Sequence, residues 1–62
     1  MRYVTISRDG DLYELTIHNP GVDPRTVHRT RAGAILTLHY WGVKDATKTV
    51  NAATEEPARV QL

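Results

Sequence analysis

Short runs of alternating apolar and polar residues, each closed by a turn sequence, constrain this chain more than any other feature. Residues 2–7 and 12–18 both carry apolar side chains at every second position, the pattern of a strand with one buried face. Asp9-Gly10 lies between the two runs, and Asp-Gly in that place is the strongest short-range signal for a β-hairpin with a type I′ turn. The first part of the chain is therefore predicted to be an antiparallel hairpin, with Val4, Ile6, Tyr13, Leu15 and Ile17 facing inward.

Two further turn signals divide the next part of the chain. Asn19-Pro20-Gly21 suits a type II turn, because Pro presets φ at the first central position and Gly accepts a positive φ at the second. Residues 27–31 are expected to form a third strand at a sheet edge, where Arg29 and Arg31 would discourage association between sheets. Ala32-Gly33 is then predicted to turn the chain again.

Residues 34–43 are the most apolar part of the chain, and we interpret them as a fourth strand. Such a strand carries apolar side chains on both faces: Leu36, Leu38 and Tyr40 on one, and Ile35, Trp41 and Val43 on the other. A strand of this kind needs a cover on both faces. Because the chain has 62 residues in all, we expect the second cover to be either the C-terminal tail or another molecule.

The pattern weakens from Lys44 onward. Asp45 is placed to cap a short helix with Ala46, Val50 and Ala53 on one side, but Thr and Val residues in this stretch are poor helix formers. Helix, strand and disorder all stay open here. The predicted fold class is all-β: a small antiparallel sheet or half-sandwich of roughly four or five strands over residues 1–43. A less ordered or short-helical tail over residues 44–62 follows it.

Composition excludes several classes of function. The formal net charge is +1, too small for non-specific attraction to nucleic acids or membranes. There is no Cys, which excludes disulfides and thiolate metal sites. No apolar run is long enough for a membrane-spanning helix, and Met1 is followed by a charged, strand-like segment that has no signal-peptide pattern. We expect a soluble, complete, cytoplasmic protein.

Neither a catalytic nor a metal site is predicted. Three histidines lie ten or eleven positions apart, unlike the closely spaced pairs that bind metals: His18, His28 and His39. They are better explained as strand residues that face solvent. The only serine, Ser7, lies beside a turn and has no neighbouring sequence typical of a nucleophile. We therefore expect a protein that is not an enzyme and has no cofactor and no metal.

Strand and turn residues follow one another along the middle of the chain in this order: Tyr13, the turn Pro20-Gly21-Val22, Val27, Gly33 and Leu36-Thr37-Leu38. This order resembles the strands and turns of part of the α-crystallin domain of small heat-shock proteins. Val60-Gln61-Leu62 is similar to the tail motif of that family, which docks between strands of a neighbouring subunit. The resemblance covers the middle half of the chain, and it implies binding of protein partners at a strand edge, self-association and chaperone-like activity.

The leading functional hypothesis is a small protein-interaction module that binds itself, as a homo-oligomer, or a partner protein through an apolar strand. The residues expected to bind protein are Ile35, Tyr40, Trp41, Val43, Val60 and Leu62. The alternative is binding of single-stranded nucleic acid, because a basic surface with aromatic side chains suits a phosphate backbone and stacked bases. The residues expected to do so are Arg25, Arg29, Arg31, Lys44 and Trp41. A membrane partner is not expected.

Overall fold

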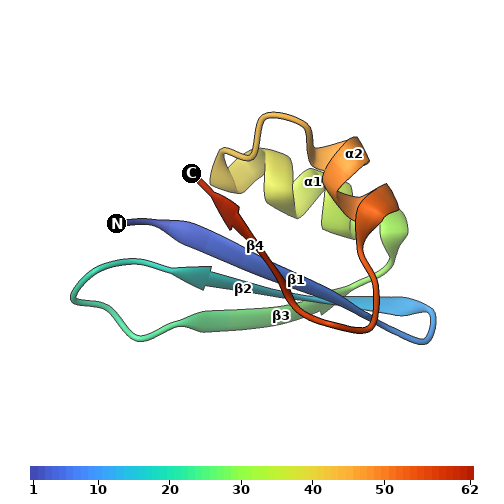
Figure 1. The fold of residues 1–62 in the computed structure, drawn as a ribbon, viewed down its shortest axis with the longest axis horizontal. Coiled ribbons are helices and arrows are strands. Elements are labelled where there is room, and N and C mark those ends of the chain that lie inside the picture. Colours follow the sequence, from blue (N-terminus) through green and yellow to red (C-terminus); the bar gives the residue numbers. More distant parts are fainter.

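Four antiparallel strands form one sheet, and two short helices cover one of its faces (Figure 1). This computed structural model describes residues 1–62. The elements are, in order, β1 (Tyr3–Asp9), β2 (Leu12–His18), β3 (Arg25–Arg29), α1 (Arg31–Trp41), α2 (Ala46–Ala52) and β4 (Ala58–Gln61). The strands lie in the order β3-β2-β1-β4. The predicted small antiparallel sheet is confirmed, while the two helices make the fold mixed rather than purely β.

The β1–β2 hairpin forms where the alternating pattern predicts it. Val4 lies opposite Ile17 and Ile6 opposite Leu15, and all four side chains are buried against the helices. The predicted type I′ turn is wrong. Asp9 pairs with Leu12, so Gly10 and Asp11 form the loop, and only Gly10 has a positive φ, +63°. A positive φ at the first loop position alone, occupied by Gly, is typical of a type II′ turn.

The second predicted turn and the third strand are also present. Gly21 has a φ of +75°, and the Val22 amide donates to the Asn19 carbonyl at 3.3 Å, as in the type II turn expected for Pro-Gly. β3 begins and ends two residues before the predicted strand and lies at one edge of the sheet. Val27 is its only half-buried residue, and it pairs with Leu15.

The strand predicted for residues 34–43 is wrong, because most of this segment belongs to helix α1. Ala34 and Leu38 are fully buried, and Trp41 packs against the same core. These residues are spaced at i, i+4 and i+7, the period of one helix face. The alternation of apolar residues in this segment is therefore incidental. The predicted turn at Ala32-Gly33 is wrong for the same reason, since both residues lie in the first turn of α1.

Helix α1 ends in a Schellman motif. Gly42 has a φ of +104°, and its amide donates to the His39 carbonyl at 3.1 Å. The Val43 amide donates to the Leu38 carbonyl at 2.9 Å, which is the second bond of the motif. This reversal directs the Val43 side chain into the core, where it is buried.

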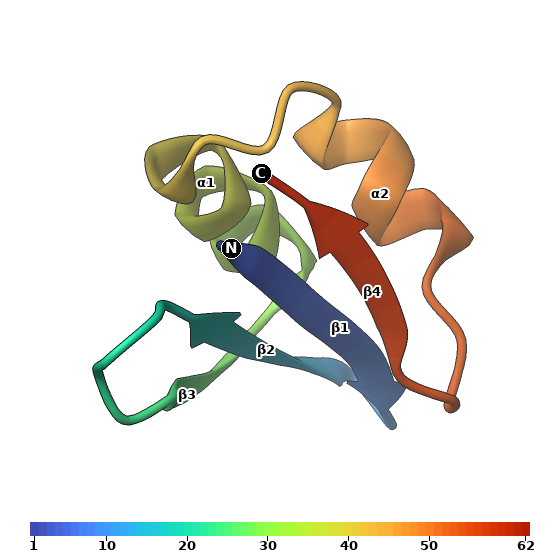
Figure 2. The same ribbon diagram turned by 60° about the vertical axis from the view of Figure 1, so that its left-hand side comes forward.

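The C-terminal third of the chain forms a helix and a strand. Asp45 occupies the N-cap position of α2 without a capping hydrogen bond from its side chain, and Ala46, Val50 and Ala53 are buried as one helical face predicts. The chain then returns to the sheet, and β4 pairs with β1 (Figure 2). The two ends of the chain are thereby side by side, since the Leu62 amide donates to the Arg2 carbonyl at 3.3 Å.

Candidate functional site

The first of three surface hollows lies between edge strand β3 and helix α1. It has a volume of about 300 Å³, and we call it the arginine–aromatic hollow. Its lining consists of Arg25, Val27, Arg29, Leu36, Thr37, Tyr40 and Trp41. It brings together residues that the sequence predicted to bind protein and residues that it predicted to bind nucleic acid.

Strand β3 supplies the basic side of this hollow. Arg25, Val27 and Arg29 are alternate residues, so their side chains lie on the same face of the strand, the face that lines the hollow with α1. Because β3 is at the edge of the sheet, the two arginines flank a single apolar side chain and stay exposed.

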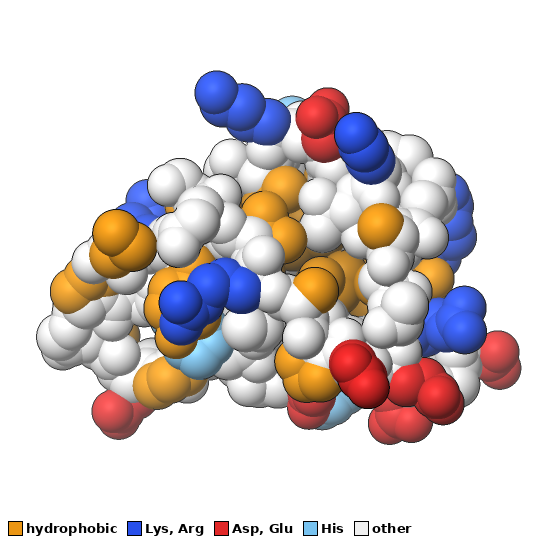
Figure 3. Space-filling model, viewed as in Figure 1, with side chains coloured by type: hydrophobic (Ala, Val, Ile, Leu, Met, Phe, Trp, Pro, Cys, Tyr) orange, Lys and Arg blue, Asp and Glu red, His pale blue; other side chains and the backbone are white.

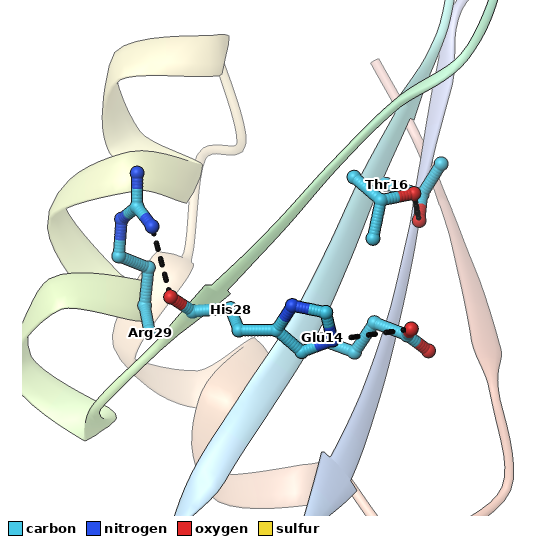
Figure 4. A network of polar contacts seen from close by, with 5 residues as sticks. Glu14, Thr16, His28 and Arg29 are labelled. Atoms are coloured by element: carbon cyan, nitrogen blue, oxygen red, sulfur yellow. Dashed lines mark hydrogen bonds and ion pairs between the residues drawn. The ribbon is translucent and has the colours of Figure 1, made fainter.

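Arg29 lies against the first turns of α1 (Figure 4). Its Nη1 donates to the His28 carbonyl at 2.8 Å. Gly33 lies beside the Arg29 stem, since a Cβ at position 33 would lie 3.4 Å from both the Cβ and the Cδ of Arg29. Neither Arg25 nor Arg29 pairs with a carboxylate, because the chain contains one ion pair only, between His28 and Glu14. The hollow therefore carries uncompensated positive charge.

Helix α1 supplies the apolar side of the hollow. Leu36 is 69% exposed and Tyr40 is 86% exposed, so both present apolar surface to solvent. Trp41 is half-buried and packs against the core, so its ring is held in place while part of it remains accessible. Leu36 and Tyr40 are four residues apart and therefore adjacent on the helix surface.

Two of the cations expected at a nucleic-acid site lie elsewhere. Arg31 Nη2 donates to Asn51 Oδ1 at 2.6 Å, which turns this side chain toward α2. Lys44 lines two other hollows and not this one. Of the five residues expected to bind nucleic acid, the structure therefore brings together Arg25, Arg29 and Trp41.

The second hollow is a larger groove of about 600 Å³ at the opposite edge of the sheet, which we call the α2–β4 groove. Its lining includes Ile6, Val43, Ala53, Ala58, Val60 and Leu62, with Lys44, Asp45 and Lys48 also present. Figure 3 shows hydrophobic side chains within the hollow and charged side chains above it. Val43 is buried and Leu62 is 39% exposed.

The residues expected to bind protein are therefore divided between separate surfaces. Tyr40 and Trp41 line the arginine–aromatic hollow, and Val43, Val60 and Leu62 line the α2–β4 groove. Ile35 is half-buried against the core and lines a third hollow, of about 530 Å³, together with Leu36 and His39. The sequence interpretation placed Ile35, Tyr40, Trp41 and Val43 on one apolar strand, and Val60 and Leu62 in the C-terminal tail. Because residues 31–41 form a helix, Tyr40 and Trp41 share no surface with Ile35 and Val43.

The face of the sheet away from the helices is polar. His28 Nε2 lies 3.4 Å from Glu14 Oε1, and the hydroxyl oxygens of Thr16 and Thr26 are 2.9 Å apart (Figure 4). Tyr3 stacks on His18 with ring centroids 4.3 Å apart, and the Arg59 guanidinium lies 3.8 Å from the Tyr3 centroid. These side chains contact one another across the strands.

Neither a metal centre nor a membrane helix is present. No three His, Cys, Asp or Glu side chains lie close enough together to hold a metal ion. Neither helix has the length and the apolar character needed to cross a membrane.

Leu36 and Val27 are site residues that the sequence interpretation missed. It assigned Leu36 to a strand face shared with Leu38, but a helix separates these two positions by 200°, at about 100° per residue. The spacing of Leu36 and Tyr40 at i and i+4 was the available signal. Val27 was recognised as apolar, but its place between two arginines on the face next to α1 depends on α1 being a helix.

Neither the family models nor the searches of curated proteins and of solved structures provided a match to this chain. The resemblance to the α-crystallin domain stays a prediction.

Proposed function

We propose that this protein is a non-enzymatic protein-interaction module that holds an acidic, partly apolar segment of a partner protein in the arginine–aromatic hollow. The observation that carries this proposal is the composition of the hollow. Arg25 and Arg29 have no carboxylate partner, and they lie beside the exposed Tyr40 and the half-buried Trp41. Trp, Tyr and Arg are the residue types most enriched among those that dominate binding energy at protein interfaces.

The two sides of the hollow supply different interactions. A guanidinium presents parallel N–H donors that match the two oxygens of a carboxylate, and such charge-assisted bonds are stronger than neutral ones. Tyr40 and Leu36 expose apolar surface to water, and a partner that covers them gains the free energy of removing that surface from solvent. Trp41 is already held by the core, so little side-chain entropy is lost when a partner contacts it.

Single-stranded nucleic acid is the second candidate, because Arg25, Arg29 and Trp41 share one hollow. A phosphate would bind the arginines and a base would stack on an aromatic ring. Two cations neutralise about two phosphates, so log K should fall with log[salt] with a slope of about −1.4. Such a short basic track favours a protein segment, with its fewer and closer charges, as the main ligand.

The proposal is tested with a library of random linear peptides displayed on phage. Selection on the wild-type protein should enrich peptides that combine Asp or Glu with apolar or aromatic residues. The double variant Arg25→Glu/Arg29→Glu should lose at least about 100-fold in affinity for them, since hydrogen bonds to charged groups contribute about 1.5–3 kcal/mol each. Tyr40→Ala should lose about tenfold, and because Tyr40 is 86% exposed its loss should leave the fold intact.

Arg8→Glu is the matched control for charge, because Arg8 is exposed on β1 and outside the hollow. It should leave peptide affinity almost unchanged. Enriched peptides without acidic residues, or peptides that bind the double variant as well as the wild type, would refute the proposal. In a parallel titration, quenching of Trp41 fluorescence by a single-stranded oligonucleotide at low salt, with the slope given above, would favour the second candidate.

A further inference from the structure

The β4 edge of the sheet has free backbone groups with a defined pattern. Antiparallel strands alternate between residues that bond to one neighbour and residues that bond to the other. The Leu62 amide donates to the Arg2 carbonyl, and Val60, two residues before Leu62, pairs with Val4. The backbone groups of Val60 and Leu62 therefore bond toward β1. The N–H and C=O groups of Arg59 and Gln61 therefore point away from the sheet.

The α2–β4 groove lies beside this free edge. Helix α2 packs against α1 and makes few contacts with β4, so a groove remains between α2 and β4. Figure 2 shows α2 and β4 on the same side of the molecule. Val60 is half-buried on the groove side of β4, and Leu62 remains 39% exposed. A strand added to β4 would direct alternate side chains into this groove.

We propose that a second copy of this chain occupies the groove, with the two β4 strands paired antiparallel about a twofold axis at Val60. In this register Arg59 of each copy pairs with Gln61 of the other. Each such pair exchanges both of its backbone hydrogen bonds, so all the outward groups of β4 are used. Val60 packs beside Val60 of the second copy, on the helix side of the combined sheet.

The two β4–β4 registers that are shifted by two residues from this one are less favourable. A shift of two residues in one direction places Arg59 opposite Arg59 of the other copy, and like charges in direct opposition are destabilising. It also places Gln61 opposite Pro57, which has no N–H to donate. The shift in the other direction leaves Arg59 without a partner in either β4. The hydrogen-bonding pattern thus selects one self-complementary register, as a twofold interface requires.

Charge supports a second copy as the occupant. Because the added strand runs antiparallel, Glu55 and Glu56 of the second copy, which precede its β4, lie beyond the Leu62 end of the groove. Lys44 and Lys48 line this groove, and neither pairs with an acid within its own chain. Asp45 also lines the groove, so these three residues carry a net charge of one positive unit. By symmetry the acid–lysine contact occurs twice in each dimer.

This interface is at the opposite edge of the sheet from the arginine–aromatic hollow, so it does not rest on the proposed function. Sedimentation equilibrium over a range of protein concentrations measures the dissociation constant of the proposed dimer. The wild type should dimerise. Gln61→Pro should weaken dimerisation roughly tenfold or more, because it removes an outward N–H that β1 does not use. Gln61→Ala, the matched control, keeps this N–H and should dimerise like the wild type. Circular dichroism should be the same for all three proteins.

A charge-swap experiment identifies the occupant. Lys44→Glu alone and Glu55→Lys/Glu56→Lys alone should each dimerise several-fold more weakly than the wild type, because like charges then meet at both contacts. An equimolar mixture of the two variants should associate again, since both contacts become attractive. A wild type that is monomeric at every concentration, a dimer unaffected by Gln61→Pro, or a mixture that fails to associate would overturn the proposal.

Discussion

The two edges of this sheet present different chemistry to solvent. At the β3 edge, Arg25 and Arg29 stand beside aromatic side chains of α1, so the peptide binding proposed there depends on side chains. At the β4 edge, the backbone groups of Arg59 and Gln61 are free beside an apolar groove, so the dimerisation proposed there depends on the main chain. The two proposed surfaces therefore lie at opposite edges of one four-stranded sheet.

The difference follows from how the helices pack. Helix α1 contacts both β2 and β3, and its buried stripe of Ala34 and Leu38 faces the sheet. Leu36 and Tyr40 are consequently left on its surface beside β3. Helix α2 packs mainly on α1, so the surface between α2 and β4 is incompletely filled.

The largest effect is expected from Leu38→Ala, which tests whether the two surfaces share one core. Leu38 is fully buried in the cluster that joins the helices to the sheet. Its truncation should cost about 2–5 kcal/mol, which is most of the unfolding free energy of a domain of this size. Urea denaturation followed by Trp41 fluorescence measures this loss. Peptide binding and dimerisation should fail together, and survival of either one in the variant would show that the surfaces fold independently.

Gly42→Ala should have the next largest effect, and it acts through the end of α1. Gly42 has a φ of +104°, where a Cβ is strained, so the substitution should lower the unfolding free energy by about 1–2 kcal/mol. Because Gly42 positions Val43 in the α2–β4 groove, dimerisation should weaken more than peptide binding. Chemical denaturation and the two binding assays compare these effects. An unchanged denaturation midpoint would contradict the stabilising role assigned to the Schellman motif at the end of α1.

Gly33→Ala should change stability in the opposite direction. Gly33 lies within α1 and has no positive φ, and the added Cβ would meet the Arg29 stem at 3.4 Å, an ordinary contact. Helix propensity should therefore raise the unfolding free energy by about 0.5–1 kcal/mol. Thermal denaturation is the measurement. A loss of stability would show that the Arg29 stem cannot move aside, and peptide affinity should then fall as well.

The smallest effect is expected from Glu14→Gln, on the polar face that neither surface uses. The Glu14–His28 pair is about half exposed at both side chains, and exposed pairs contribute at most about 1 kcal/mol. We expect a change below about 0.5 kcal/mol in urea denaturation and none in either binding assay. A larger effect on binding would place this face within a functional surface.

Strands β1 and β2 were predictable from the sequence because their signals are local. Period-two alternation and the glycines at positions 10 and 21 define β1, β2 and the turns after them. Helix α1 was not predictable in the same way, because its apolar residues fit both periods: Leu36, Leu38 and Tyr40 alternate, while Ala34, Leu38 and Trp41 follow a helix. The glycine at position 42 favoured the helix, since Gly is common just past a helix C-terminus.

The candidate surfaces depended on this one assignment. With residues 34–43 in a strand, Tyr40 and Trp41 fall on opposite faces, and the surface that they share with Arg25 cannot be foreseen. The pairing of β4 with β1 joins segments more than fifty residues apart in sequence, and no local pattern specifies such a contact. Val60 and Leu62 were nevertheless expected to bind protein, and they line the α2–β4 groove.

The most direct measurement is a two-dimensional amide NMR titration with an acidic, aromatic peptide from the library selection, at a protein concentration where dimerisation is complete. The indole N–H of Trp41 and the amides of β3 and of the C-terminal half of α1 should shift, while those of Arg59 and Gln61 should not move. Shifts confined to β4 and α2, or shifts absent from Trp41, would contradict the assignment of the arginine–aromatic hollow as the partner site.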